Sequence, residues 1–349
     1  MDNNFIVSSS PHIRTGETIQ SIMFNVILAL IPATAYGVYV FGFKALIVVL
    51  VSIASAVITE AAFQKIRKKK VTISDLSAVL TGLLLAMNLP PAAPWWLAMV
   101  GSIFAIALAK QVFGGIGHNF INPALAARAV LIASWSARMG TWDVPFSSSG
   151  FFAYDAVTGA TPLGIIAEGS GEALPSFWDA FIGNVGGCIG ETSALFLILG
   201  GLYLIYKGII TWHIPFSYII SAFVFSFLLN GFDAAYSAYQ LIIGGIMLGA
   251  FFMATDYASS PVTDKGKIIY GVGIGLLTIL IRTFGSLPEG VSYSILLMNV
   301  ATPMIDRFTT SVVFGGKTKK QIKAEKKAKE AEEMAALKAE KEAVEGGAK

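Results

Sequence analysis

The chain has 349 residues, of which 55% are hydrophobic and only 13% are charged, and its mean hydropathy is +0.68. Soluble domains usually carry about 25% charged residues, so this composition excludes a soluble enzyme, a nucleic-acid-binding protein and a disordered chain. The charges are also uneven, because residues 317–349 hold 17 of the 47 formal charges. The sequence therefore predicts a polytopic membrane protein with a short charged tail.

Cysteine and histidine are too scarce to build a metal or disulfide framework. The one cysteine, Cys188, excludes a disulfide framework, a cysteine-rich zinc site and an iron–sulfur cluster held by this chain alone. The three histidines are scattered, so we expect no histidine-based metal site either. Cys188 itself is expected to be a small packing residue.

Ten apolar segments predict membrane-spanning helices. A span needs about 20 mostly apolar residues, and fewer where a helix is broken or buried. The predicted spans are residues 21–41, 45–62, 73–89, 95–110, 120–135, 182–206, 212–229, 238–254, 268–284 and 292–313. The predicted fold class is therefore an all-α integral membrane protein with about ten transmembrane helices.

Lysine and arginine predict the orientation of these spans. Residues 64–70, between the second and third spans, carry five positive charges, and short cytoplasmic loops are rich in such residues. With ten spans, Lys110, Lys207 and the charged tail fall on the same side. We expect a multi-pass protein of the bacterial cytoplasmic (inner) membrane with both termini in the cytoplasm.

The predicted organisation has five parts. A cytoplasmic N-terminal segment precedes a first group of five helices, an extracytoplasmic loop separates it from a second group of five, and a cytoplasmic tail that is helical or disordered follows. The expected boundaries are residues 1–20, 21–135, 136–181, 182–316 and 317–349.

Two stretches of the chain resemble each other. Residues 82–88 (Gly-Leu-Leu-Leu-Ala-Met-Asn) correspond to residues 249–255 (Gly-Ala-Phe-Phe-Met-Ala-Thr), and a proline-bearing break follows each. An odd number of spans per half makes the halves run in opposite directions, which predicts inverted five-helix repeats with functional sites beside broken helices. The urea-transporter fold is one such architecture. The alternative is a chance recurrence of small apolar residues.

The predicted outer loop contains the string Asp-Ala-Val-Thr-Gly-Ala-Thr-Pro at residues 155–162. Its residues predict an exposed tight turn that presents the Thr161 hydroxyl, with Pro162 favouring extended backbone before it. The string resembles the flavinylation motif Asp-x-x-Ser/Thr-Gly-Ala-Thr, in which a flavin transferase esterifies the phosphate of FMN to the last threonine. The resemblance implies covalent FMN on Thr161, and a chance turn is the alternative. It also implies motif roles for Asp155, Thr158, Gly159 and Ala160.

A second segment, residues 114–125, has the sequence Gly-Gly-Ile-Gly-His-Asn-Phe-Ile-Asn-Pro-Ala-Leu. Its glycines permit a sharp turn and close approach of a ligand, Asn119 is expected to cap the following span, and Pro123 suits an early helical position. The helix N-terminus then favours a polar ligand. Arg128, inside that span, must face a partner, a cavity or a ligand.

This segment resembles the membrane flavin subunits of the Rnf and sodium-pumping NADH:quinone reductase complexes. The resemblance implies that Asn119 and Asn122 lie at a non-covalent riboflavin near the cytoplasmic face. Capping alone is the alternative interpretation of each asparagine. Arg128 is included among the candidate cofactor-binding residues because of its place on the same span.

A third segment, residues 252–263, resembles the same family through its Met-Ala-Thr-Asp and Ser-Pro-Val-Thr strings. Asp256 within it is an ion ligand, a flavin contact or a solvated cap, and the sequence leaves these open. Glu60, near the end of the second span, is a candidate for cation passage. Alternatively, Glu60 snorkels or pairs with the basic loop at residues 65–70.

The resemblance covers nearly the whole chain, and the short segment before the first span favours the D subunit of Rnf complexes within the family. It implies a ferredoxin:NAD+ oxidoreductase component that carries FMN and riboflavin and passes electrons across the membrane, coupled to Na+ or H+ translocation, without being catalytic alone. The implied partners are the A, B, C, E and G subunits of Rnf, especially the second FMN carrier, together with a flavin transferase and membrane lipid. The alternatives are the B subunit of the Na+-translocating NADH:quinone reductase, a cofactor-free channel or transporter, and a scaffold protein.

Overall fold

Helices make up most of the first half of the chain. The computed structural model describes residues 16–146, 157–168, 174–285 and 289–310. Thr18 caps the first helix by accepting a hydrogen bond from Ser21 N, and Gly42, with φ of +75°, separates it from the second. The elements of this half are α1 (Ile19–Phe41), α2 (Phe43–Ile66), η1 (Ile73–Asp75), α3 (Ser77–Met87), α4 (Trp95–Ile103), the π-helical η2 (Phe104–Gln111) and α5 (Pro123–Ser134).

The second half of the chain also combines longer helices with short broken ones. Its longer helices are α13 (Asp264–Phe284) and α14 (Val291–Thr309), and α9 (Ala194–Tyr206) and α10 (His213–Leu229) are of intermediate length. Between α10 and α13 lie α11 (Ala234–Ile242), α12 (Ile246–Leu248) and the π-helical η4 (Gly249–Met253). The connecting region contains α6 (Ser136–Met139), α7 (Pro162–Glu168), α8 (Phe177–Ile182) and η3 (Ile189–Glu191).

The helices are those of a membrane protein, as the sequence predicts. Three of them, α1, α2 and α13, are long and apolar enough to cross a membrane, and a fourth span results if the bent pair α11 and α12–η4 counts as one. The other apolar helices, which include α3, α5, α9 and α10, are shorter than 18 residues. Broken and short helices at membrane depth are tolerated where protein surrounds them.

Two predicted spans differ from the structure. The predicted helix over residues 182–206 is helical only from Ala194, because residues 183–193 follow an irregular path through η3. Gly183 starts this path with φ of +113°, and a Cβ there would meet Thr192 O at 2.0 Å. The predicted helix over residues 238–254 is broken and bent by 66°.

Small residues allow the principal helix pairs to pack closely. In the first half α2 packs on α3 and α4, and in the second half α10 packs on α13. A Cβ on Gly82 would lie within 2.8 Å of the α2 backbone, and one on Gly275 would lie within 2.0 Å of Ser221 Oγ on α10. Close backbone approach at glycine is a common means of helix association in membranes.

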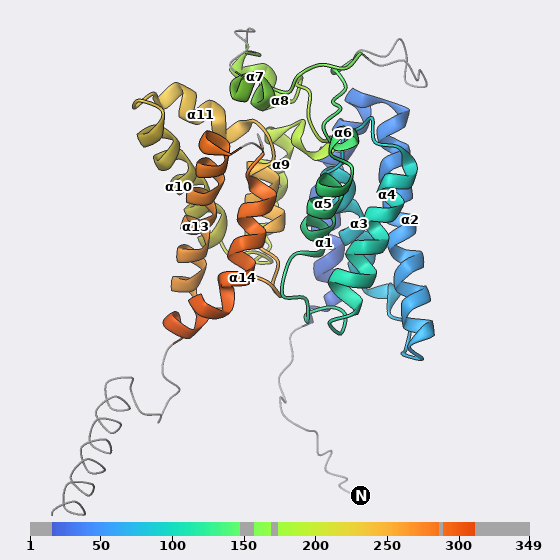
Figure 1. Cartoon of the computed structure of the whole chain (residues 1–349). Coiled ribbons are helices and arrows are strands. Elements are labelled where there is room, and N and C mark those ends of the chain that lie inside the picture. The colour runs from blue at the N-terminus through green and yellow to red at the C-terminus, as the bar shows by residue number, and fades with distance from the viewer. Residues whose placement is uncertain (1–15, 147–156, 169–173, 286–288, 311–349) are drawn as a thin grey trace, which may run out of the picture. The chain divides into compact units, whose positions relative to one another are not determined.

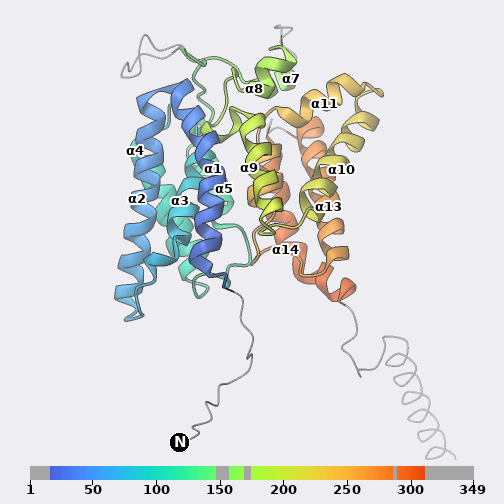
Figure 2. The same cartoon turned by 180° about the vertical axis from the view of Figure 1, so that it is seen from behind.

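The described residues up to Asp306 form one compact unit. In both views the helices α1–α5 gather on one side of it and α9–α14 on the other (Figures 1 and 2). The predicted loop of residues 136–181 is not irregular throughout, because α6, α7 and the start of α8 lie within it. The predicted tail, residues 317–349, lies outside the described residues.

Candidate functional site

Three residues singled out by the sequence line one pocket. Asn119, Asn122 and Asp256, which are up to 137 positions apart, border a cavity of about 120 Å³. Most of the other walls are apolar and come from α1, α3, α9, the segment just after α9, and η4. They include Ile22, Val26, Leu80, Leu84, Leu204, Ile209, Phe251 and Phe252. The pocket is therefore an apolar chamber with a small polar edge, as is usual for a small-molecule site.

Asn122, and not Asn119, caps the helix α5. Its Oδ1 accepts hydrogen bonds from Ala124 N at 3.0 Å and Leu125 N at 3.3 Å, and Pro123 occupies the first helical position. The expectation that Asn119 is the cap is wrong, because Pro123 fixes the start of the helix one residue after Asn122. Asn122 Nδ2 also donates to Met253 O at 3.1 Å, so the same amide joins α5 to η4.

Asn119 and Asp256 form the polar edge of the pocket. Asn119 Nδ2 donates to Asp256 Oδ2 at 3.1 Å, and Ser259 Oγ donates to the same oxygen at 3.0 Å. Burial raises the pKa of the Asp256 carboxyl above its usual range, although these hydrogen bonds act in the opposite direction. Asp256 is therefore not a freely solvated cap, and it remains a candidate for contact with a ligand or an ion.

Glu60 has a different partner from the one expected. Lys110 Nζ, from η2, donates to Glu60 Oε2 at 3.0 Å and to Ser77 Oγ at 2.6 Å, and both ions of the pair are buried. The proposed pairing of Glu60 with the loop at residues 65–70 is wrong, because α2 packs against η2 and brings Lys110 closer. Lys110 also lines the pocket, whereas Glu60 does not, so the ion pair fixes a lysine in the pocket wall from behind.

Arg128 belongs to a second cluster and does not line the pocket. Its guanidinium donates to Asn88 Oδ1 at 2.7 Å, approaches Glu191 Oε1 at 3.5 Å, and forms an ion pair with Glu289. Its side chain is directed at the irregular segment before α9, so Arg128 faces protein partners, one of the three possibilities that the sequence leaves open. Sequence reasoning missed Asn88 and Glu191 as its partners, although an uncompensated arginine within a span does call for a nearby carboxylate.

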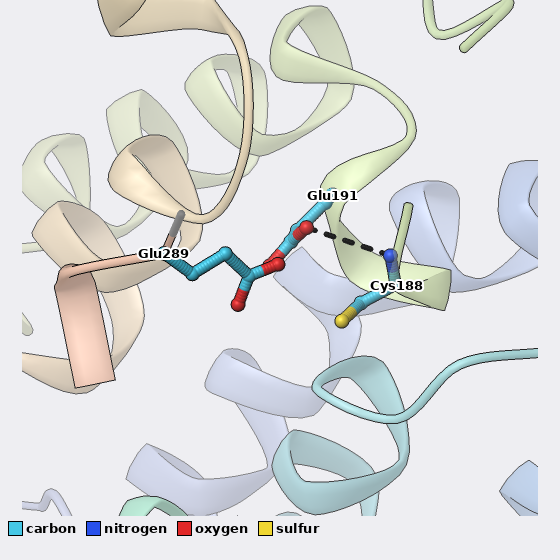
Figure 3. A group of neighbouring side chains, drawn as sticks. All are labelled: Cys188, Glu191 and Glu289. Atoms are coloured by element: carbon cyan, nitrogen blue, oxygen red, sulfur yellow. Dashed lines mark hydrogen bonds between the residues drawn. The ribbon is translucent and has the colours of Figure 1, made fainter. Parts of the chain in front are cut away.

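Cys188, Glu191 and Glu289 point toward a common space (Figure 3). One ligand atom from each lies within 4.8 Å of the others, but Arg128 Nη2 contacts all three residues. A built-in guanidinium therefore already supplies the positive charge in this space. Cys188 is fully buried, as its predicted packing role requires.

Thr161 lies at the start of α7, and its side chain is turned inward. Thr161 is only 9% exposed, and its Oγ1 accepts a hydrogen bond from Gly164 N at 3.0 Å. It shares a cavity of about 10 Å³ with Glu191 and Glu289. The expectation of an exposed threonine is therefore wrong, because the hydroxyl folds back onto the helix that Pro162 begins.

The residues just before Thr161 are exposed. Thr158, Gly159 and Ala160 lie at the surface, where the segment pairs with residues 142–144 through an isolated bridge between Asp143 and Thr158. Asp155, the first residue of the motif, lies outside the described residues. The described part of the motif is thus a surface segment that ends at a buried hydroxyl.

The pocket and Thr161 lie at opposite ends of α1. Ile22 and Met23, near the start of α1, line the pocket, whereas Val40 O, near its end, accepts a hydrogen bond from Phe146 N just beyond the segment that pairs with the motif. A helix rises 1.5 Å per residue, so these ends are about 30 Å apart. Both views place α7 at the end away from the start of α1 (Figures 1 and 2).

These features define a multi-pass helical membrane protein with a polar-edged pocket at one end and a threonine-bearing surface motif at the other. Residues 6–315 match the NQR2, RnfD, RnfE family, and the chain belongs to this family. It is 56% identical, over 92% of its length and 99% of the relative, to the D subunit of the Na(+)-translocating ferredoxin:NAD(+) oxidoreductase complex of Acetobacterium woodii. It is 48% identical, over 90% and 97% respectively, to the D subunit of the proton-translocating ferredoxin:NAD(+) oxidoreductase complex of Clostridium ljungdahlii.

Proposed function

We propose that this chain is the D subunit of an Rnf-type ferredoxin:NAD+ oxidoreductase and that it carries electrons across the membrane. Its relatives with 56% and 48% identity are named as subunits of such complexes, and both alignments span nearly the whole of each chain. One relative is named for sodium and the other for protons, so we propose coupling to Na+ or H+ without choosing between them. The chain acts within the complex and is not catalytic alone.

The pocket at Asn119, Asn122 and Asp256 would hold riboflavin non-covalently. A flavin ring has one apolar edge and one edge rich in hydrogen-bonding groups, and the pocket offers apolar walls with amide and carboxyl groups at one side. The meeting of these three residues in a single apolar pocket is the observation that carries the proposal. Lys110 and Asp256 would orient the polar edge of the ligand, and the apolar walls would exclude water.

Thr161 would carry FMN through a phosphoester. The exposed residues Thr158, Gly159 and Ala160 would give a flavin transferase its recognition segment, together with Asp155. Small neighbours leave room for a substituent, since a Cβ on Gly164 would lie 3.3 Å from Thr161 Oγ1 and Gly186 lines the same small cavity. When bound, the flavins supply the electron-transfer chemistry, and the protein supplies position, burial and hydrogen bonds.

We infer that the chain crosses the membrane about ten times as two inverted five-helix repeats of the urea-transporter type. The matching helix pairs in the two halves, α2 with α4 and α10 with α13, support this interpretation, as do the π-helical segments η2 and η4. The basic loop after α2 supports cytoplasmic termini in the bacterial inner membrane. Partners would be the A, B, C, E and G subunits of Rnf, the flavin transferase and lipid.

The proposal is tested by replacing the attachment hydroxyl. We expect Thr161→Ala to insert normally and to lose all covalent flavin, because no oxygen remains to form the ester. The measurement is in-gel flavin fluorescence of the denatured chain, co-expressed with an active flavin transferase. Thr141→Ala is the matched control, because Thr141 is a partly exposed threonine at the same end and should leave the signal unchanged.

The same gel distinguishes the proposed redox role from a channel, transporter or scaffold without a covalent cofactor. A fluorescent wild-type band that disappears in Thr161→Ala supports the redox role. A wild-type chain without fluorescence, beside a control protein that the transferase does modify, would favour a channel, transporter or scaffold that carries no covalent cofactor. Fluorescence that persists in Thr161→Ala would place the attachment elsewhere.

A further inference from the structure

A polar cavity of about 230 Å³ lies beside α7, apart from the pocket at Asn119. Ile166 and Ala167 of α7 form one wall, and the facing wall contains Tyr236, Gln240 and Arg282. Ser226 and Asn230, at the end of α10, complete its polar lining. None of these residues belongs to the two sites described above.

Arg282 brings an incompletely paired positive charge to this cavity. Its Nη1 donates to Gln240 O at 2.7 Å and to Gln240 Oε1 at 3.1 Å, and its Nη2 donates to Ile243 O at 3.1 Å. Its Nε is buried and has no hydrogen-bond partner. In the described part of the chain no carboxylate lies within ion-pair distance of Arg282, which is half-buried, and removing a charge from water is costly unless it is paired.

The neighbouring polar groups add further donors. Tyr236 Oη accepts from Gln240 Nε2 at 2.9 Å, so its own proton is left for a ligand. Ser226 Oγ accepts from Asn230 Nδ2 at 3.2 Å in the same way. A guanidinium and two hydroxyl donors select a ligand that is rich in acceptors and bears negative charge.

Gly244 lies between the Arg282 cavity and the small cavity at Thr161. Gly244 lines the small cavity that contains Thr161. A Cβ on Gly244 would lie 2.6 Å from Leu163 Cδ1 of α7 and 2.8 Å from Arg282 Nη2. The backbone at Gly244 also has φ of +69°, which favours glycine. A group attached at Thr161 therefore starts within a few side chains of Arg282.

We propose that the Arg282 cavity holds the acceptor-rich pyrimidine edge of the flavin attached to Thr161. This inference rests on the proposed function, because it requires a flavin at Thr161. The pyrimidine edge presents ring nitrogens and carbonyl oxygens, which match the donors of Arg282, Tyr236 and Ser226. It also carries the negative charge that reduction adds, so the guanidinium favours the reduced form and acts as a positioning and charge-stabilising residue.

The test is the midpoint potential of the covalent flavin in the assembled complex, measured by redox titration of its absorbance. Arg282→Gln removes the charge and is expected to lower the potential, by an amount equivalent to at least a tenfold change in the equilibrium constant. Tenfold corresponds to about 59 mV for a one-electron step. Arg282→Lys keeps the charge and should restore most of the potential. Arg138→Gln, which removes an exposed charge on α6, is the matched control and should leave it unchanged.

Each outcome has a definite meaning. An Arg282→Gln complex with covalent flavin and an unchanged potential overturns the inference but leaves the attachment at Thr161 intact, and this result is also the one expected if the cavity binds a lipid phosphate or free phosphate. A wild-type chain without covalent flavin overturns both. If Arg282→Gln does not accumulate, Tyr236→Phe replaces it, with a smaller downward shift expected, and no shift in that variant overturns the inference.

Discussion

The two ends of the helical bundle differ in the space that each offers to a ligand at its key residues. At one end, Asn119, Asn122 and Asp256 already surround a cavity of about 120 Å³. At the other end, the cavity that contains Thr161 itself measures about 10 Å³, close to the space of one water molecule, and the larger cavity of about 230 Å³ lies beside it at Arg282. A ligand held only by contacts must be enclosed where it binds, whereas a covalently attached ligand can be anchored at one point and lie in a neighbouring cavity. This contrast is the one expected for the proposed non-covalent and covalent flavins.

Each end is also backed by a different buried charge arrangement. Lys110 and Glu60 form a one-to-one pair behind the pocket. Behind Thr161, Arg128 faces two carboxylates, Glu191 and Glu289. The first arrangement is neutral by itself, and Glu191 in the second keeps a buried oxygen without a hydrogen bond. The charges behind the pocket thus balance as one pair, whereas behind Thr161 two carboxylates share one guanidinium.

The largest effect is expected from breaking the buried ion pair of Lys110 and Glu60. Lys110→Met leaves Glu60 buried without its cation, and losing one partner of a buried pair costs about 3–5 kcal/mol. We expect a lower unfolding temperature in detergent and loss of riboflavin from the pocket that Lys110 lines. Differential scanning fluorimetry and the riboflavin content of the purified chain measure the two effects.

Lys207→Met is the matched control for this change, because Lys207 is an exposed lysine just after α9. The double variant Glu60→Gln/Lys110→Met should recover part of the lost stability, since no buried charge is left alone. Equal unfolding temperatures for Lys110→Met and Lys207→Met would contradict the role of the ion pair.

An intermediate effect, on the binding of riboflavin, is expected from replacing Asn122, the N-cap of α5. Asn122→Leu removes both the cap and the bond to Met253 O, and a lost cap costs about 1 kcal/mol. We expect roughly tenfold weaker riboflavin binding, which corresponds to about 1.4 kcal/mol, with covalent FMN unchanged. Extraction with acid followed by fluorescence quantifies the released riboflavin.

Asn122→Asp sharpens this result, because aspartate also caps helices well but cannot donate to Met253 O. Riboflavin loss in the leucine variant alone would assign the effect to helix capping. Loss in both would assign it to the amide donor, and retention in both would remove Asn122 from the site.

The sequence predicts the class of membrane protein and several helix boundaries, because a long apolar run rarely forms anything other than a membrane-spanning helix. The predicted first and second spans, residues 21–41 and 45–62, fall within α1 and α2. The sequence does not predict the irregular path at residues 183–193, because hydropathy predicts a helix for an apolar run with glycines. In the structure Ile189 N instead donates to Leu89 O, and a Cβ on Gly190 would meet Met87 O at 2.8 Å. Ordinary length and composition rules cannot detect such a break.

For the candidate site, too, the sequence predicts some groupings of residues and misses others. Motif residues that share one turn or one cap, such as Asn119 and Asn122, can be grouped from the sequence alone. The partners of Glu60 and Arg128 could not, because each comes from a segment at least 40 positions away. Which of several intramembrane charges pair is decided by helix packing, and packing depends on the small-residue contacts of the whole bundle.

The smallest effect is expected at Asp256, between η4 and α13. Burial raises the pKa of this carboxyl in the folded chain, so the folded state holds its proton more tightly than the unfolded state does. Stability associated with this group therefore falls as the pH rises from the ordinary value of 3.8 through the raised pKa. Asp256→Asn removes the titration, and its unfolding temperature should depend less on pH in that window. The change in unfolding temperature should stay near the 2–4 °C that about 1 kcal/mol produces in a larger domain.

Ser260→Ala is the control for this prediction. Ser260 lies at a half-buried position beside the same turn, and the variant should keep the wild-type dependence of unfolding temperature on pH. Identical profiles for wild type and Asp256→Asn would mean that the carboxyl is solvated, and the pocket would then lose its acidic edge.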